Sequence, residues 1–396
     1  MNKVYLTVKQ LPKYRQITFE DMLAGMTDGK SYILWNKTGT ITRRVNASDK
    51  LREKRDISMM ELRLKYFCDN FKWLIESDLH THYNTFYIPK KSGGLRKICA
   101  PDKELSQALR DLKSLFEEFM PATYHTSAYA YIENRSTIDE RGPHQRHESQ
   151  WYSYFDFHDF FGSTTPKFVM DMLKATYPFN FIIEDGYEDI LRAALSLAFL
   201  DGGLPQGTPF SPLITNIMMI PFDHTMTMML REFSNPRARN GSDHFIYTRY
   251  ADDLCVSCRN EFDVELIQKL ILDTLEYFGA PFSLNTKKTK YQSRSGKNFH
   301  LGVIINKDNN ITLGHQKKRR IKAMVCNYMM DKKNGKDWPL HDVQILNGQL
   351  AYFHKIEPES QKNMLAHFSE KFGKSVEEAI HNDLVSKSQD DSSDWE

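Results

Sequence analysis

The 396-residue chain has few cysteines, little net charge and no long apolar run. Five cysteines without regular spacing argue against a disulfide-stapled secreted protein. Its apolar runs, such as 193–200, are far shorter than the roughly 20 residues that span a bilayer, and its first residues lack the charged and apolar regions of a signal peptide. A content of 40% hydrophobic residues excludes a disordered polyelectrolyte. We therefore expect a globular, cytoplasmic protein without a membrane partner.

Strand-like and helix-like patterns alternate along the chain, which predicts an α+β fold with a mixed sheet. A basic hairpin is predicted over 86–101, where Ser-Gly-Gly forms the turn, and a second hairpin joins β-prone runs at 245–250 and 254–258. Helices are predicted at 59–77, 104–118, 165–176, 187–200, 264–278, 317–331 and 342–353. In the first helix, Leu62, Tyr66 and Phe67 are expected to share one apolar face.

Two adjacent aspartates, Asp252 and Asp253, lie in the turn of the otherwise apolar second hairpin. Neighbouring carboxylates near 4 Å repel by about 4 kcal/mol at an effective dielectric of 20, so a positive partner is expected. A hard cation with oxygen ligands, such as Mg²⁺, fits this need. Taken alone, however, the dipeptide is also an ordinary β-turn sequence.

A third carboxylate strengthens the metal interpretation. In the run 152–161, aromatic and acidic residues alternate, so Asp156 is expected at the end of a half-buried strand. Together with Asp252 and Asp253 it would form a two-metal site for phosphoryl transfer. The basic hairpin offers ligands for a triphosphate, with Arg96 making bidentate contacts. The added point charges come from Lys90, Lys91 or Lys97.

Five motifs in order resemble the reverse transcriptases of bacteria, a group that includes retron, group II intron, abortive-infection and other defence-associated enzymes. The resemblance covers about 86–352. It rests on the run 88–101, on Asp156 followed by Phe160-Phe161, on Leu204-Pro205-Gln206-Gly207-Thr208-Pro209-Phe210-Ser211-Pro212, on Tyr250-Ala251-Asp252-Asp253, and on Leu284-Asn285-Thr286-Lys287-Lys288-Thr289.

The resemblance implies a right-hand polymerase with fingers, a palm built on an antiparallel sheet with helices, and a helical thumb. The expected parts are an N-terminal helical extension (1–85), fingers (86–155), a palm (156–303) with a fingers insertion at about 165–200, a thumb (304–380) and an acidic flexible tail (381–396).

The resemblance also assigns roles around the metals. Asp156, Asp252 and Asp253 would bind two Mg²⁺ ions, for which Mn²⁺ could substitute, and the backbone of Phe157 would complete one metal shell. Lys288 would lie near the leaving pyrophosphate. Two further positions, Gln206 and Gly207, would pass close to the nascent base pair.

Phe161 lies at the family position that stacks beneath the incoming sugar, and a bulky ring there leaves no room for a 2′-hydroxyl. The resemblance therefore implies a DNA product, whereas Phe160 is expected in the core. The segment 128–137 and the more distant His144 correspond to a stretch that contacts template and packs fingers against palm. For His144, a purely structural role is at least as well supported.

Downstream, the run 299–303 resembles the strand pair that grips the primer end. Retron enzymes usually have a Val-Thr-Gly signature near here, and this chain has Leu301-Gly302 instead, which favours a non-retron, defence-associated group. Four adjacent cations suit the phosphates of a template–primer duplex, although a basic helix face can also be merely solvated. They are Lys317, Lys318, Arg319 and Arg320, and Tyr250 completes the predicted nucleic-acid contacts.

The predicted function is an RNA-directed DNA polymerase that uses deoxynucleoside triphosphates to copy an RNA template in antiviral (phage) defence. The predicted template is a dedicated structured noncoding RNA. The predicted partners are that RNA, the DNA product and an effector or second reverse transcriptase, and self-association stays open. Three alternatives remain: a retron enzyme that makes multicopy single-stranded DNA, a protein-primed or untemplated DNA polymerase, and a catalytically inactive RNA-binding module.

Overall fold

The computed structural model describes residues 31–36, 39–44, 47–90, 93–120, 124–232, 244–296 and 298–393, with side chains from Ile57 onward except at 231–232 and 388–393. The chain divides into two compact units, 1–292 and 293–396, each described here by itself. Within the described ranges, no helix has the length and apolar character needed to cross a membrane.

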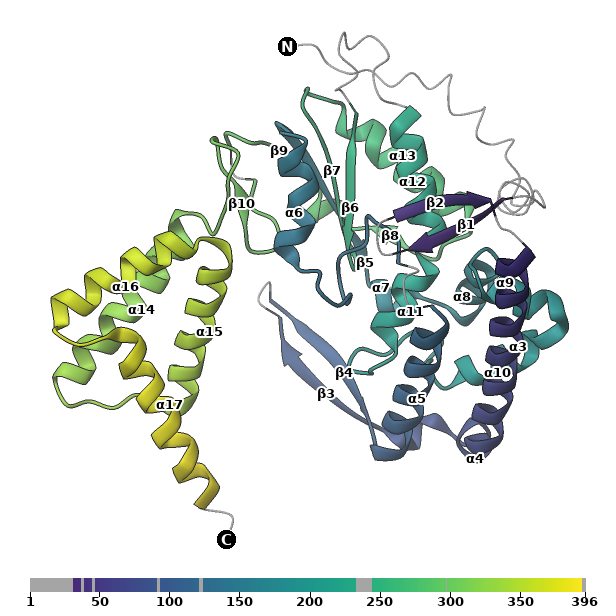
Figure 1. Cartoon of the computed structure of the whole chain (residues 1–396), viewed down its shortest axis with the longest axis horizontal. Helices are drawn as coiled ribbons and strands as arrows, with labels where there is room; N and C mark the ends of the chain where they lie inside the picture. The colour runs from purple at the N-terminus through teal and green to yellow at the C-terminus, as the bar shows by residue number, and fades with distance from the viewer. Residues whose placement is uncertain are drawn as a thin grey trace. The chain divides into compact units, whose positions relative to one another are not determined.

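The first unit is built around a five-stranded sheet, here called the palm sheet (Figure 1). Its order is β6-β7-β5-β8, and β9 also pairs with β5. The pairings β5–β7, β6–β7 and β5–β8 are antiparallel. The strands are β5 (Trp151–His158), β6 (Ile246–Tyr250), β7 (Asp253–Cys258), β8 (Ser283–Leu284) and β9 (Lys290–Ser293). The second predicted hairpin is thereby confirmed as β6–β7.

Helices cover both faces of this sheet. Because successive side chains of a strand point to opposite sides, neighbouring residues of one strand contact different helices. On β6, Tyr247 and Arg249 contact Asp223 of α12 (Ile220–Glu232), whereas the intervening Thr248 contacts Glu140 of α6 (Thr137–Arg146). Strands β5 and β7 are consequently buried almost throughout.

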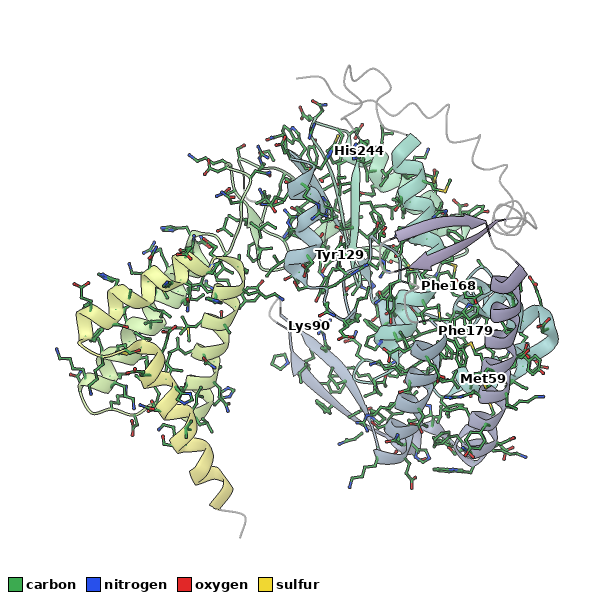
Figure 2. All side chains as sticks on the ribbon, in the orientation of Figure 1. Met59, Lys90, Tyr129, Phe168, Phe179 and His244 are labelled. Atoms are coloured by element: carbon green, nitrogen blue, oxygen red, sulfur yellow. The ribbon has the colours of Figure 1, made fainter. Side chains whose placement is uncertain are left out.

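The basic hairpin predicted over 86–101 is also confirmed, as β3 (Tyr83–Pro89) and β4 (Leu95–Pro101). Its turn contains Gly93 and Gly94, both at positive φ, a conformation that glycine adopts without steric cost. Lys90 lies at the tip of this hairpin (Figure 2). After β4, Asp102 caps α5 (Lys103–Phe119) by accepting a hydrogen bond from the Leu105 amide.

The N-terminal extension was predicted to be helical, and the structure corrects this in part. An antiparallel hairpin, β1 (Ser31–Asn36) and β2 (Gly39–Arg44), precedes α3 (Ala47–Asn70), which packs beside α5 and α10 (Figure 1). The predicted apolar face of α3 was wrong for Leu62 and Tyr66, which are exposed. The buried face instead follows the helical spacing of Met60, Leu64 and Phe67.

The remaining elements of the first unit are short helices that complete one hydrophobic core. They are α4 (Lys72–Ile75), η2 (Leu79–His82), α7 (Phe160–Ser163), α8 (Pro166–Leu173), α9 (Phe179–Ile182), η3 (Ile183–Tyr187), α10 (Glu188–Ser196), α11 (Ser211–Met218), α13 (Val264–Tyr277) and η4 (Thr286–Lys288). The helices predicted near 104–118, 165–176, 187–200 and 264–278 are confirmed within a few residues as α5, α8, α10 and α13.

The second unit is a helical bundle with its own core, preceded by the short strands β10 (Ile304–Ile305) and β11 (Ile311–Thr312). Its helices are α14 (His315–Lys333), α15 (Leu340–Ile356), α16 (Pro358–Phe372) and α17 (Val376–Ser393). The predicted flexible tail at 381–396 is corrected up to Ser393, because α17 continues to that residue. Buried Asp383 ties α17 to α14 by accepting hydrogen bonds from Tyr328 (2.9 Å) and Lys332.

Candidate active site

The three predicted metal ligands come together at one end of the palm sheet. Asp156 of β5 is paired in register with Asp253 of β7. Asp252 stands in the turn between β6 and β7, where Ala251 has a left-handed backbone with φ of +57°. The Phe157 amide donates a hydrogen bond to the Asp252 carbonyl (3.1 Å), which ties the turn to β5. Asp156 and Asp253, 97 residues apart in sequence, are thus neighbours because strand pairing aligns them.

Lys288 supplies the positive charge closest to this cluster. Its ammonium lies 2.8 Å and 2.9 Å from the two carboxylate oxygens of Asp156. The Asn285 amide donates to the Asp156 carbonyl (2.8 Å), so η4 is attached directly to the end of β5. Sequence reasoning expected Lys288 near the leaving group, and the structure places its ammonium against the carboxylate of Asp156, a predicted metal ligand.

The electrostatics of the cluster fit divalent cations. Burial, followed by the charges of Asp252 and Asp156, raises the pKa of Asp253 to about 7 against the opposing effect of Lys288. The pKa of Asp252 is raised mainly by burial and then by Asp156. One ammonium therefore does not neutralise three partly desolvated carboxylates, and hard cations with oxygen ligands would do so. Asp156, Asp252 and Asp253 are the residues that would hold them.

A tighter group of candidate ligands lies elsewhere, and its surroundings explain it without a metal. Ligand atoms of Glu140, His144 and Cys255 lie within 4.8 Å of one another. However, His144 Nδ1 lies 2.5 Å from Ser257 Oγ and Nε2 lies 2.7 Å from Thr248 Oγ1, so both ring nitrogens have hydroxyl partners. Burial lowers the pKa of His144, which favours the neutral ring. This supports the structural interpretation of His144 over template contact.

The two phenylalanines after Asp156 separate as expected. Phe160 is 2% exposed and packs against Phe157 and Phe282. Phe161 is only partly buried, and its ring stands at 80° to that of Phe160. The Leu204 amide donates to the Phe161 carbonyl (2.9 Å), which fixes this residue beside the loop that carries the next predicted motif.

That loop packs closely on the basic hairpin. The Cys99 amide of β4 donates to the Gln206 carbonyl (2.9 Å), and a Cβ added to Gly207, at φ of +113°, would lie 2.9 Å from Ile98 Cγ2. The close approach that requires glycine at 207 is therefore to β4.

Among the predicted triphosphate ligands, Lys97 already has an acidic partner. Its ammonium lies 3.2 Å from Asp201, and this hydrogen bond raises the pKa of Lys97. Arg96 and Lys90 lie on the same exposed hairpin, and Lys91 lies outside the described residues.

Sequence reasoning missed the support of the Ala251 turn. Arg249 is fully buried, donates to both carboxylate oxygens of Asp223 through Nε (2.9 Å) and Nη2 (2.7 Å), and also donates to the Ala251 carbonyl (3.1 Å). The available signal was an arginine within an apolar strand, since a buried charge requires a partner. The Asp223 partner itself could not be predicted, because it depends on how α12 packs.

In the second unit, the predicted strand pair at 299–303 is corrected to a turn. Leu301 and Gly302 both have positive φ (48° and 94°), and the bridge between His300 and Val303 closes the turn. The strands follow at β10 and β11. From α14, the Lys317 ammonium lies 4.2 Å from the centroid of the Tyr352 ring, a cation–π contact.

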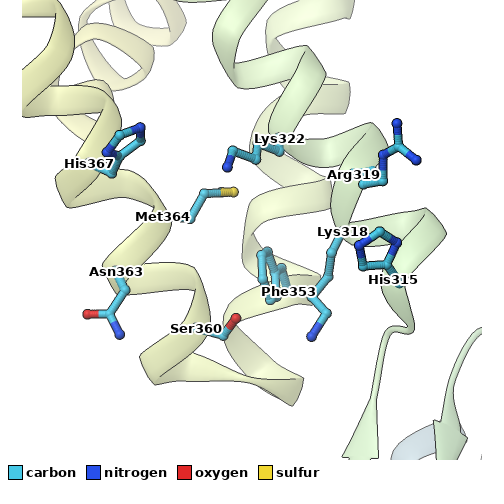
Figure 3. Close-up of a pocket in the computed structure, with 9 residues that line it drawn as sticks. All are labelled: His315, Lys318, Arg319, Lys322, Phe353, Ser360, Asn363, Met364 and His367. Carbon is cyan, nitrogen blue, oxygen red and sulfur yellow. The ribbon is translucent and has the colours of Figure 1, made fainter.

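The same helix borders a basic cavity of about 480 Å³ between α14 and α16 (Figure 3). Its lining includes Lys318, Arg319 and Lys322 at helical spacing and, on α16, His367. Lys318 is paired with Glu357 (2.7 Å), whereas no acidic residue lines the cavity itself. Arg320 lies on the exposed surface of α14.

Comparison with known proteins adds an independent line of evidence. Residues 88–317 match the family described as reverse transcriptase (RNA-dependent DNA polymerase). The chain is similar to the retron Ec83 reverse transcriptase of Escherichia coli, with 27% identity over 335 residues that cover 81% of this chain and 96% of the relative. It is also similar to the retron Ec73 reverse transcriptase of Escherichia coli, with 31% identity over 276 residues that cover 68% and 82%.

A bacterial relative from another genus is the retron Mx65 reverse transcriptase of Myxococcus xanthus, with 27% identity over 293 residues that cover 72% of this chain and 63% of the relative. Among solved structures, an apo telomerase from Candida tropicalis is matched with a TM-score of 0.44 at 12% identity, over 95% of this chain and 73% of that one. That similarity is too weak to support an inference.

Proposed function

The chain belongs to the reverse transcriptase family and is an RNA-directed DNA polymerase similar to those of bacterial retrons, and from this premise we propose that Asp156, Asp252 and Asp253 bind two Mg²⁺ ions at its active site. The observation that carries the proposal is the register of β5 on β7, which sets Asp156 opposite Asp253 beside the Asp252 turn. The raised pKa values of Asp252 and Asp253 support it, since an excess of buried negative charge calls for cations.

When bound, such ions would activate the primer hydroxyl and stabilise the leaving oxygen. The chain's own residues hold the site in shape. Phe157 ties the Asp252 turn to β5 through its amide, and its carbonyl is the proposed further metal ligand. The protonated Nζ of Lys288 is paired with the Asp156 carboxylate. Lys288 is proposed to lie near the leaving pyrophosphate.

The nucleotide site is proposed to lie between the basic hairpin and the aspartates. Arg96 and Lys90 would contact the triphosphate, whereas Lys97 would contribute less because Asp201 already neutralises its charge. Gln206 and Gly207 would face the nascent base pair from a loop held by β4. Phe161 would stack beneath the sugar and exclude a 2′-hydroxyl, so that deoxynucleotides are selected.

We propose that the second unit binds nucleic acid through α14. Lys317, Lys318, Arg319 and Arg320 would contact phosphates, with Lys318 contributing less because Glu357 already neutralises its charge. The cavity between α14 and α16 has no acidic residue in its lining, which supports an anionic ligand there. The turn at Leu301 and Gly302 is proposed to contact the primer end, as is Tyr250 in the first unit.

The template is proposed to be a dedicated structured noncoding RNA, and the DNA made from it to act in antiviral defence. The similarity to three retron enzymes favours retron-type synthesis of multicopy single-stranded DNA more than the motif at Leu301-Gly302 suggested. A role in defence rests on family resemblance, and an effector partner or second reverse transcriptase is part of this proposal.

Primer extension on an RNA template tests the site. The wild-type protein with Mg²⁺ should extend a primer with deoxynucleotides, and Asp253→Asn should lose activity by several orders of magnitude. The exposed turn residue Asp308 provides a matched control, because Asp308→Asn should retain full activity. Equal activity of Asp253→Asn and wild type would overturn the assignment of the site.

Sequencing of RNA and DNA that copurify with the protein, beside Asp253→Ala, tests the biological proposal. One RNA species with DNA joined to it would support retron-type synthesis, whereas free complementary DNA would favour another defence class. DNA joined covalently to a Tyr or Ser would instead indicate protein priming. If Asp253→Ala left biological activity intact, the protein would act as an RNA-binding module.

A further inference from the structure

The loop before α6 presents a tyrosine to the candidate active site. Tyr131 has a left-handed backbone with φ of +58°, which is unusual for a bulky residue and is maintained only where the surroundings enforce it. Its side chain is 51% exposed, so burial in a core does not explain this conformation. The left-handed conformation is therefore imposed by the backbone segment that contains Tyr131.

Hydrogen bonds fix the residues that precede Tyr131. The loop pairs with β6 at Arg249, whose amide donates to the Ser127 carbonyl (2.6 Å) and whose carbonyl accepts from the Tyr129 amide (2.9 Å). The side chain of Asn216 on α11 donates to the Ala130 carbonyl (2.7 Å). Tyr131 thus follows a backbone segment held by a strand and a helix, which fixes the position of its Cα.

The Tyr131 side chain lies near Phe161 and the acidic turn. The rings of Tyr131 and Phe161 are 6.4 Å apart and nearly perpendicular (73°), an edge-to-face arrangement. Burial raises the pKa of Tyr131, as do the charges of Asp252 and Tyr250, whereas Arg96 opposes them. Tyr131 is therefore close to the proposed sugar-binding ring, to a proposed metal ligand and to a proposed triphosphate ligand.

A shared support links Tyr131 with the catalytic turn. Arg249, paired with Asp223, holds the Tyr131 loop through its backbone and the Ala251 carbonyl through its guanidinium. Asn216 is within 3.5 Å of the same guanidinium while its amide holds Ala130. The aspartates and Tyr131 are consequently fixed to one buried framework.

We propose that Tyr131 is a specificity-determining residue of the polymerase, whose ring supports Phe161 and so maintains the selection of deoxynucleotides over ribonucleotides. The inference rests on the proposed role of Phe161. Because Tyr131 is 51% exposed, it adds little to the core, and its proposed role depends on the contact of its ring with Phe161. Without that ring, Phe161 can move aside and leave space for a 2′-hydroxyl.

The test compares incorporation of a deoxynucleotide with that of the matching ribonucleotide as a ratio of kcat/KM values. Tyr131→Ala should reduce this ratio by about 2- to 12-fold, the strength of an edge-to-face aromatic pair. Tyr131→Phe keeps the ring and should change it by less than about 2-fold. Tyr66→Ala, at a 67% exposed tyrosine of α3, is the control and should leave the ratio unchanged.

A double-mutant cycle with Phe161→Ala separates the two proposals. Phe161→Ala should lower selectivity strongly, and adding Tyr131→Ala to it should have no further effect, because the supported ring is gone. Independent, additive effects, or full selectivity in Tyr131→Ala, would overturn the role of Tyr131 while the Phe161 gate stands. Full selectivity in Phe161→Ala would overturn the gate and the inference together.

Discussion

Replacing Asp253 with asparagine should stabilise the metal-free protein while it abolishes DNA synthesis. In the folded chain, burial and the neighbouring Asp252 and Asp156 raise the pKa of Asp253 from 3.8 to about 7. A carboxyl whose pKa is higher in the folded state contributes its full stability below pH 3.8, and this contribution is lost as pH rises through about 7. Asparagine has a similar shape and no proton to lose, so Asp253→Asn avoids this loss.

The expected size follows from the two pKa values. The interval between 3.8 and about 7 corresponds to an upper bound of about 4 kcal/mol at 1.36 kcal/mol for each tenfold change. The cluster is partly open to solvent, and we therefore expect about 2–3 kcal/mol at pH 8. The advantage of Asp253→Asn should be negligible near pH 4 and constant above about pH 7.

Urea unfolding in the presence of a metal chelator measures this difference from pH 4 to pH 8. Asp308→Asn, at an exposed turn, serves as the control and should match wild type at every pH. Added Mg²⁺ should stabilise wild type at pH 8 and stabilise Asp253→Asn much less. The reasoning is refuted if Asp253→Asn is no more stable than wild type at pH 8 without metal.

Other substitutions test other parts of the site. Lys288→Ala removes the ammonium beside Asp156 and should lower kcat by about 100-fold with a smaller effect on KM, measured by single-nucleotide incorporation. Asp223→Asn leaves Arg249 buried without its anionic partner and should lower the free energy of unfolding by about 3–5 kcal/mol in urea, and a smaller loss would show that water reaches this site. Arg320→Gln should weaken duplex binding and reduce the slope of log affinity against log salt by about 1, and an unchanged slope would exclude phosphate contact.

Much of the site could be predicted because it depends on local patterns. Asp156 ends a strand of alternating residues, and Asp252 and Asp253 occupy a turn between two apolar runs, so the hairpin and its carboxylates follow from periodicity and charge. The separation of Phe160 from Phe161 came from the family resemblance. The structure confirms the burial of Phe160, whereas the gate at Phe161 stays a prediction.

What sequence reasoning missed depends on packing between distant elements. Tyr131 reaches Phe161 because Asn216 and Arg249 hold its loop, and neither contact has a local signature. Similarly, Leu62 and Tyr66 were assigned to the apolar face of α3. The helix instead packs through Met60, Leu64 and Phe67, and Leu62 and Tyr66 remain exposed. The tail from 381 was predicted to be flexible because of its acidic end, whereas buried Asp383 ties this part of the chain into the bundle.

The central claim is that three aspartates share two metal ions, and counting those ions tests it most directly. Paramagnetic resonance can titrate Mn²⁺ into the protein bound to an RNA template, a chain-terminated primer and a deoxynucleoside triphosphate. Two tightly bound ions in wild type, and loss of both when Asp156, Asp252 and Asp253 are all replaced by asparagine, is the predicted result. Two equally tight ions in that triple variant, once ions held by the nucleotide alone are subtracted, would contradict the account.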